Sequence, residues 1–375
     1  MTNIKTLKPA RVKGPGNIIL RYLNSLGWNQ VDLAEITGVS VKTISQIINH
    51  KQAISVEMAK VLAKAFNNNP EFWLNLDNQY RLQSVNSESK EDSAAIKAKI
   101  RRYMPVLEIQ KNNWVQTSDN TAKGYEATFR EIWGTDYNDT SVYEKSPQYA
   151  ARNNKENPDY TCFYSMTWLK IAHNRAEKIS VPLYDRTKLE QIQTDFSKLT
   201  LYPDGINVLQ KELKDAGVKF LYQKPLKKTY LDGACFFDGD NPVIVYTGRY
   251  DRIDHFWFTM AHEISHILLH LKKSDSEYIL DNFEIEGEDE REEEANRTAG
   301  KMLYYDEIVA LSRPIANYFA EKKLIEISNK VGVDPSIVLG KLQHDEIISY
   351  NSRFNHYKRK IIDQYFIPEI DRLRS

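Results

Sequence analysis

Two histidines four residues apart are the side chains of this 375-residue chain best suited to chemistry. His262, Glu263 and His266 form an H-E-x-x-H pattern within an apolar run, residues 256–269. In a helix, positions four apart lie on one face, so both imidazoles can bind one zinc ion. Glu263 can then accept a proton from a water that the zinc activates. The pattern predicts a zinc site for peptide hydrolysis, with His262 and His266 as ligands and Glu263 as general base.

A chance match inside an apolar helix is the competing interpretation. We favour zinc because a buried carboxylate is costly unless it is paired or bound to a metal. A catalytic zinc also needs a third protein ligand and an open position for water. His270 lies too far along the helix from His262 to be that ligand, and we expect it to end or cap the helix.

A downstream acidic segment offers the third ligand. Residues 290–303 place Ala295 and Ala299 at helical spacing, which predicts a second helix with a small-residue face that can lie close to the first. Glu292 falls on this face and is the expected zinc ligand, with Glu293 as the alternative, and Asn296 is the expected partner of the ligand one turn on. Most of the eleven acidic residues in 275–294 are expected to form a solvated surface.

The first part of the chain has the pattern of a helix-turn-helix. Apolar spacing predicts five short helices, at residues 17–26, 30–36, 41–49, 56–66 and 70–81. Gly27 ends the first, Gly38 makes the turn between the second and third, and Asn29, Ser40 and Ser55 are expected N-caps. In a helix-turn-helix the second helix of the pair enters the major groove of DNA.

The third predicted helix presents polar side chains suited to DNA. Lys42 can donate to guanine, Gln46 can pair with adenine, and Thr43 can contact a thymine methyl group. The full expected set is Gln30, Lys42, Thr43, Ser45, Gln46, Asn49 and Lys51. Residues 1–83 carry ten Lys/Arg and five Asp/Glu, a net charge of +5 in a chain of zero formal net charge. Such domains usually bind near-palindromic operators as dimers, so we expect a homodimer on double-stranded DNA.

The remaining segments complete the expected organisation. We expect the polar stretch 84–93 to be a linker and residues 94–200 to form a helical connecting region. We expect the metallopeptidase core at 201–313 and a helical tail at 314–375. A strand is expected at 218–222, and a hairpin is expected from strands at 233–237 and 243–247. The fold class is therefore α+β and mainly helical, with a small sheet.

Composition restricts the class of protein. Hydrophobic residues are 41% and charged residues 27%, as in ordinary globular proteins. The two cysteines, Cys162 and Cys235, are expected in the core and not in a disulfide. No apolar run reaches a membrane span and the start lacks a signal peptide, so we expect a cytoplasmic protein with no membrane contact.

Two parts of the chain resemble known protein families. Residues 256–270, with Glu292 and the pair Ala295-Asn296, resemble the ImmA/IrrE family of zinc endopeptidases, bacterial and phage proteins that cleave helix-turn-helix repressors. The resemblance implies a zincin-like fold with a gluzincin-like site: metal ligands His262, His266 and Glu292, general base Glu263. Residues 26–49 resemble XRE/Cro-type helix-turn-helix domains, closest to HigA/VapI-type antitoxins, and 331–344 are similar to the end of fused HigA–ImmA proteins. The antitoxin resemblance implies a cognate toxin as a partner.

Two functions follow from these features. The first is a DNA-binding regulator with a zinc endopeptidase that cleaves a regulatory protein, or itself near 84–93. The second is a non-proteolytic antitoxin-like repressor in which the zinc domain is a sensor or scaffold. An exported protease would explain neither the basic helix-turn-helix nor the missing signal peptide. We expect the strand at 243–247 to hold a substrate peptide as an added strand. Tyr304 and Tyr305 are candidates for stabilising the oxyanion.

Overall fold

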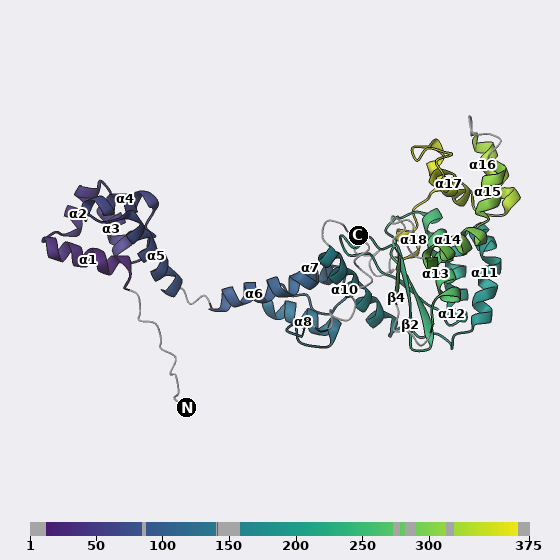
Figure 1. The fold of residues 1–375 in the computed structure, drawn as a ribbon, viewed down its shortest axis with the longest axis horizontal. Helices are drawn as coiled ribbons and strands as arrows, with labels where there is room; N and C mark the ends of the chain where they lie inside the picture. The colour runs from purple at the N-terminus through teal and green to yellow at the C-terminus, as the bar shows by residue number, and fades with distance from the viewer. Residues whose placement is uncertain are drawn as a thin grey trace, which may run out of the picture. The chain divides into compact units, whose positions relative to one another are not determined.

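The computed structural model describes residues 13–84, 88–139, 141, 158–272, 278–281, 290–312 and 319–366. The chain divides into two units, residues 1–94 and 95–375, whose elements are labelled in Figure 1. Helix α6, Glu88–Tyr103, begins inside the stretch that we predicted as a linker, so most of that stretch is helical. No helix among the described residues is both long and apolar enough to cross a membrane.

The described part of the first unit contains the five predicted helices. They are α1 Pro15–Leu26, α2 Gln30–Thr37, α3 Val41–Ile48, α4 Val56–Ala65 and α5 Pro70–Ser84. Asn29, Ser40 and Ser55 accept hydrogen bonds from the first backbone N–H groups of α2, α3 and α4, as predicted. Gly27 and Gly38 both have φ of +70°, a conformation that glycine adopts without steric cost.

Apolar side chains spaced along these helices form one core. The α3 side chains Ile44 and Ile47 pack with Leu33 from α2 and with the indole of Trp73 from α5. All four are buried. The helix-turn-helix pair α2–α3 is therefore fixed by apolar contacts on one side, which leaves the other side of α3 for solvent or a ligand.

A four-stranded sheet organises the second unit. The strand order is β1-β3-β2-β4, with β1 Lys219–Tyr222, β2 Gly233–Asp238, β3 Asn241–Tyr246 and β4 Tyr278–Asp281. β2 and β3 form the predicted antiparallel hairpin, β4 adds antiparallel to β2, and β1 lies parallel to β3. The expectation that 243–247 holds a substrate strand is wrong, because β3 is paired on both sides and has no free edge.

Helices cover both faces of this sheet. Alternation along the strands sends Ala234 and Phe236 toward a layer formed by α6, α7 Val106–Lys111, α8 Ala122–Trp133 and α10 Pro158–Ala176. Cys235 and Ile244 point the other way, toward α11 Arg186–Leu201, α12 Gly205–Asp215 and α13 Ile253–Leu269. Figure 1 shows α8 and α10 on one side of β2 and β4 and α11–α13 on the other. The segment predicted as a connecting region thus contributes to both layers.

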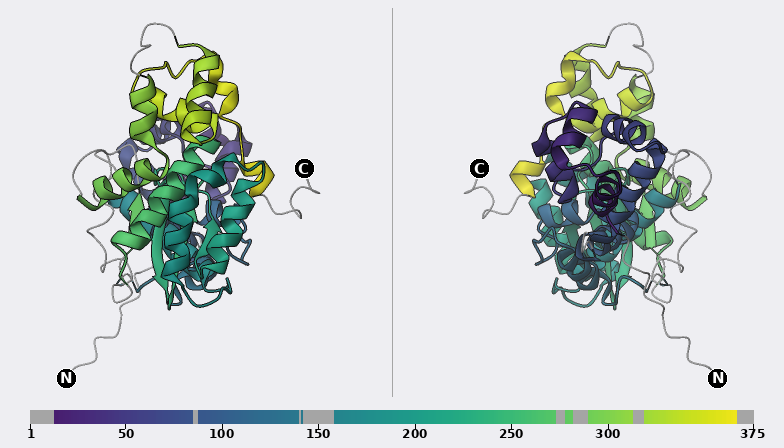
Figure 2. Two further views of the ribbon diagram at one scale, coloured as in Figure 1. Left: turned by 90° about the vertical axis from the view of Figure 1, so that its right-hand side faces the viewer. Right: turned by 90° about the vertical axis from the view of Figure 1, so that its left-hand side faces the viewer.

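The helix with the H-E-x-x-H pattern, α13, lies in the second layer beside α14, Glu290–Met302. The left view of Figure 2 shows the helices of this layer side by side. The buried residues Ala295 and Ala299 form the small-residue face predicted for α14, and α14 lies close to α13. Helix α15, Tyr305–Ser312, follows α14 and packs on the same core. The described residues of the predicted tail also pack on this core, and they form helices: α16 Glu321–Val331, α17 Pro335–His344, the 3₁₀ helix Arg353–Tyr357 and α18 Ile362–Tyr365.

Candidate metal centre and DNA-facing helix

Helix α13 buries three ionisable side chains within one and a half turns. His262, Glu263 and His266 are fully buried, between apolar neighbours such as Met260 and Ile264. Burying a carboxylate and two imidazoles in such surroundings costs free energy unless each group has a partner of matched chemistry. The helix therefore carries polar groups that its packing alone does not explain.

A carboxylate from α14 completes a three-residue cluster. The Nε2 atoms of His262 and His266 are 2.8 Å apart, and Oε2 of Glu292 lies 3.3 Å from the first and 3.5 Å from the second. One ligand atom from each of the three residues lies within 4.8 Å of the others. Ligand atoms about 2.0–2.1 Å from one tetrahedral ion are about 3.4 Å apart. The two nitrogen–oxygen distances match this spacing and the nitrogen–nitrogen distance is shorter, so the three atoms can bind a single divalent ion if the two imidazoles move slightly apart.

The first residue of β2 makes room for Glu263. A Cβ atom built on Gly233 would lie 1.9 Å from Oε1 of Glu263 and 3.2 Å from the methyl group of Thr259. Only glycine leaves this space, so the sheet and α13 approach closely at the carboxylate. The sequence predicted Gly233 as the start of a strand, and its role beside Glu263 depends on a contact between distant segments.

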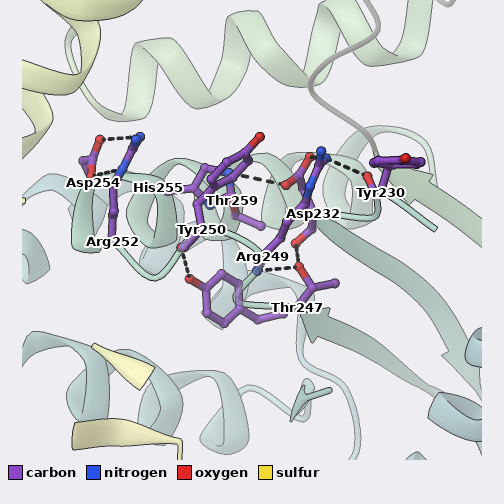
Figure 3. Close-up of polar contacts among 10 residues, drawn as sticks. Tyr230, Asp232, Thr247, Arg249, Tyr250, Arg252, Asp254, His255 and Thr259 are labelled. Atoms are coloured by element: carbon purple, nitrogen blue, oxygen red, sulfur yellow. Dashed lines mark hydrogen bonds and ion pairs between the residues drawn. The ribbon is translucent and has the colours of Figure 1, made fainter. Parts of the chain in front are cut away.

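A buried polar network fixes the strand next to Gly233, as Figure 3 shows. The carboxylate of Asp232, fully buried, lies 3.3 Å from Nη1 of Arg249 and 3.6 Å from Nε2 of His255. Arg249 also donates to the carbonyl of Tyr230 at 2.9 Å, and Nδ1 of His255 is 3.3 Å from the hydroxyl of Thr259. His255, Thr259 and Glu263 follow one another at intervals of four along α13, so this network lines the same helix face as Glu263.

Burial lowers the pKa of His255 to about 3. The carboxylate of Asp254 opposes this shift, whereas the positive charges of Arg252, Arg249 and Lys358 add to it. His255 is therefore neutral at neutral pH.

A second buried ion pair joins the beginning of α13 to the tail. Asp254 lies 3.1 Å from Nζ of Lys358 and 3.1 Å from Nη2 of Arg252, and both Asp254 and Lys358 have side chains that are only 6% exposed. Figure 3 shows the pairing of Arg252 with Asp254. The backbone N–H groups of Ile361 and Ile362 donate to Asp251 at 2.8 and 2.9 Å. Residues more than a hundred positions away thus hold the start of α13.

The other residues predicted around the site have different positions. Glu293, the alternative ligand, and Asn296 are both exposed, and neither belongs to the three-residue cluster found among the described residues. The ring of Tyr305 stacks at 5.9 Å on Phe258, whose ring is 6.1 Å from that of His262, whereas Tyr304 is exposed. Burial raises the pKa of Tyr305.

His270 lies at the end of α13 as predicted, but it also contacts the site. Its Nδ1 is 2.9 Å from Nδ1 of His266, and its Nε2 is 3.0 Å from Oε2 of Glu294. His270 lies about two turns from His262 but only about one turn from His266. The spacing of four residues that links the two predicted ligands also links His266 with His270.

In the first unit, the residues predicted to contact DNA lie on α3 and around it. Lys42, Asn49 and Lys51 are exposed, and the others are partly buried: Gln30, Thr43, Ser45 and Gln46. Two of them also have structural contacts, because Thr43 lies 2.9 Å from the Ser40 hydroxyl and Asn49 donates to the carbonyl of Ser45 at 2.8 Å.

Comparison with known proteins covers both units. Residues 19–73 match the helix-turn-helix family, and residues 213–343 match the family described as the IrrE N-terminal-like domain. Virulence-associated protein A' of Dichelobacter nodosus is 42% identical over 83 residues, 21% of this chain and 72% of that protein. An uncharacterized HTH-type transcriptional regulator of Haemophilus influenzae is 37% identical over 101 residues, 26% of this chain and 92% of that protein. Antitoxin HigA-1 of Vibrio cholerae is 32% identical over 78 residues, 21% of this chain and 73% of that protein.

The chain belongs to the helix-turn-helix family. Its first unit carries an antitoxin-like helix-turn-helix domain of transcriptional regulators, and its second carries a domain of the ImmA/IrrE peptidase family. Both resemblances inferred from the sequence are therefore confirmed. The IrrE-like domain contains every residue of the metal cluster and its buried networks except Lys358 and the tail around it.

Proposed function

We propose that this chain is a DNA-binding, antitoxin-like regulator whose IrrE-like domain is a zinc endopeptidase. The observation that carries the proposal is the convergence of His262, His266 and Glu292 on one point, with the buried carboxylate of Glu263 on the same helix. Two imidazoles and one carboxylate are a ligand set typical of catalytic zinc, which keeps a fourth position open.

In the proposed mechanism the three ligands hold the metal and Glu263 transfers the proton. Zinc held by the three ligands would supply a water of lowered pKa and would polarise the scissile carbonyl. Glu263 accepts the proton of the attacking water and returns it to the nitrogen of the leaving amine. Gly233 leaves the space that the Glu263 carboxylate occupies, and the Asp232 network holds Gly233 in place.

The helix-turn-helix domain supports a regulatory substrate. We infer that the domain binds an operator as a homodimer through Lys42, Gln46 and their neighbours, with a cognate toxin as a further partner. The peptidase would cleave a regulatory protein or this chain near 84–93, which would separate the DNA-binding domain from the rest. Incubation of the zinc-loaded protein followed by intact-mass measurement tests self-cleavage, and an unchanged mass would leave a second protein as the substrate.

The metal proposal is tested by measuring metal per chain. Wild type, His262→Ala, Glu292→Ala and Glu293→Ala are purified without chelators and analysed by inductively coupled plasma mass spectrometry. We expect about one zinc per chain in wild type and little in the first two variants. Glu293→Ala is the matched control, because it removes a neighbouring exposed carboxylate from the same helix. Wild-type protein without zinc, even after zinc is added back, would contradict the proposal.

The catalytic proposal is tested by Glu263→Gln. This substitution preserves shape and leaves the three ligands in place, so zinc content should match wild type while hydrolysis is lost. Retained hydrolysis would remove Glu263 from the mechanism. Wild-type protein that binds zinc but cleaves neither itself nor any helix-turn-helix regulator tested would favour the sensor or scaffold function.

A further inference from the structure

A chain of polar contacts leads from the metal centre to the surface. His270, whose side chain is 6% exposed, lies between His266 and Glu294, which is 54% exposed. Its Nδ1 is 2.9 Å from Nδ1 of His266, and its Nε2 is 3.0 Å from the Glu294 carboxylate. His266 lies in the last turn of α13, His270 is the C-cap of that helix and Glu294 lies on α14, and these two helices also carry the predicted ligands.

Metal binding by His266 determines where the protons lie on His266 and His270. Nε2 of His266 faces His262 and Glu292, so Nε2 is the atom available to an ion. A neutral imidazole that binds a metal through Nε2 carries its proton on Nδ1. That N–H can only donate, so Nδ1 of His270 accepts. The proton of neutral His270 is then on Nε2, where it is donated to the carboxylate of Glu294.

We propose that His270 and Glu294 position His266 as a metal ligand. The contacts hold the His266 ring in one orientation, select the tautomer that leaves Nε2 free for zinc, and increase the basicity of the ring through the carboxylate. Outer hydrogen-bond partners of ligating histidines act in this way, and their removal weakens metal binding about 10–100-fold. The inference rests on the proposed zinc site and assigns His270 a positioning role, not a catalytic one.

Zinc affinity tests the proposal directly. Competition with a chromophoric chelator gives the zinc dissociation constants of wild type, His270→Ala and His270→Asn. We expect His270→Ala to weaken zinc binding by about tenfold or more, and His270→Asn to recover part of the loss. The Asn side-chain oxygen occupies the place of Nδ1 and can accept from His266, whereas Ala offers no acceptor. A loss of less than about twofold in His270→Ala, or equal losses in both variants, would overturn the proposal.

The outer carboxylate has a matched control on the same helix. Glu294→Gln should weaken zinc binding by about threefold, because the carboxylate is partly exposed and its contribution is screened by solvent. Glu293→Gln removes the same charge from an exposed neighbour and should have no such effect. In a His270→Asn background, Glu294→Gln should add nothing further, since the connecting Nε2–H is gone. If Glu293→Gln and Glu294→Gln weaken zinc binding equally, the effect of Glu294 comes from its charge alone and not from its contact with His270, which would contradict the proposal.

Nitrogen NMR supplies a readout that does not depend on affinity. In the zinc-loaded wild type, the proton should be on Nδ1 of His266 and on Nε2 of His270, and Nδ1 of His270 should be bare. A proton on Nδ1 of His270 would overturn the proposed direction of the hydrogen bonds. This measurement decides the question even if His270→Ala does not fold. Wild-type protein that binds no zinc would overturn both proposals, whereas zinc binding unaffected by His270 would overturn only this one.

Discussion

The helix-turn-helix domain and the IrrE-like domain place their functional side chains in opposite environments. In the first, the residues expected to contact DNA are exposed or partly buried, and Lys42 is among the exposed ones. In the second, His262, Glu263 and His266 are completely buried. Side chains that stay hydrated add little cost to folding, whereas buried polar groups must be paired by the rest of the fold.

This difference decides how far each domain depends on long-range contacts. Helices α2, α3 and α4 begin at capping residues that are adjacent in sequence, so their ends are determined locally. Around α13, partners come from α14, from the strand at Gly233 and from the tail at Lys358. The polar groups of the second unit therefore contribute to its stability. Substituting them should change the free energy of unfolding as well as the function.

The largest expected effect is the loss of a buried ion pair. Asp254→Ala leaves the ammonium group of Lys358 buried beside Arg252, and breaking such a pair should destabilise the second unit by about 3–5 kcal/mol. The first unit contains the matched case, since its buried Asp77 pairs with Arg81 at 2.9 Å, but Arg81 is 34% exposed and can be rehydrated. Asp77→Ala should therefore destabilise less, by about 1–3 kcal/mol. Urea unfolding of both variants measures the comparison.

A double variant sharpens that comparison. Replacing both partners, as Asp254→Ala with Lys358→Met, removes the stranded charge and should recover part of the lost stability. If Asp77→Ala and Asp254→Ala lower the free energy of unfolding equally, then the difference in burial between Arg81 and Lys358 does not determine the cost of losing the pair.

Gly233→Ala should produce the next largest effect. The added methyl group would overlap Oε1 of Glu263, which is fully buried and has little room to move. A displacement of about 1 Å in a catalytic group can cost about 100-fold in rate, so hydrolysis should fall by that order while zinc content stays unchanged. The control is Gly300→Ala, because its Cβ would meet Tyr305 at an ordinary contact of 3.4 Å. If hydrolysis by Gly233→Ala equals that of wild type, Gly233 does not restrict Glu263.

The sequence predicted most of the fold because most of its elements are determined locally. All five helices of the helix-turn-helix domain and the hairpin of β2 and β3 begin and end within a few residues of their predicted bounds. The sequence failed where position depends on distant partners. Alternating apolar residues predicted β3, but they do not tell whether a strand is central or at an edge, so the substrate-strand expectation was wrong.

The sequence also predicted that His262, His266 and Glu292 lie together, again because local spacing determines most of this arrangement. Spacing along one helix brings His262 and His266 together, and the small-residue face of α14 indicated Glu292. By contrast, Gly233 and Asp232 lie beside Glu263 only because β2 packs on α13, and no pattern in one segment indicates this contact. Helical spacing brings His270 beside His266, so the sequence alone could have predicted that contact.

The pH dependence of stability should also differ between the units. His255 has its pKa lowered from 6.5 to about 3 in the folded protein, so the unfolded state binds more protons between these values. Stability of the second unit should therefore fall as the pH decreases below about 6.5, by up to about 1.4 kcal/mol per pH unit. The charged groups around His255 are Asp232, Asp254, Arg249, Arg252 and Lys358.

A difference between variants isolates this effect. His255→Asn should flatten the pH dependence of urea unfolding relative to wild type. In the first unit, burial and then Arg81 lower the pKa of His50 in the same direction, but His50 is much less buried, so His50→Asn should change the slope less. A second unit whose pH dependence is the same with and without His255 would show that this histidine is not neutral in the folded protein.

The smallest effect on stability is expected on α3, the helix predicted to contact DNA. Lys42→Ala should change the free energy of unfolding by less than about 0.5 kcal/mol, because the side chain is already hydrated. Binding to a duplex selected by this protein from a random pool should nevertheless weaken by about 1–3 kcal/mol if Lys42 contacts a base. The matched control is Lys60→Ala, which removes the same charge from the exposed surface of α4. If both variants weaken DNA binding equally, Lys42 contributes only its charge. If only Lys42→Ala weakens DNA binding, and stability is unchanged, then DNA binding in this domain depends on a side chain that folding does not need. The buried His262, Glu263 and His266 of the second unit do not allow such a separation.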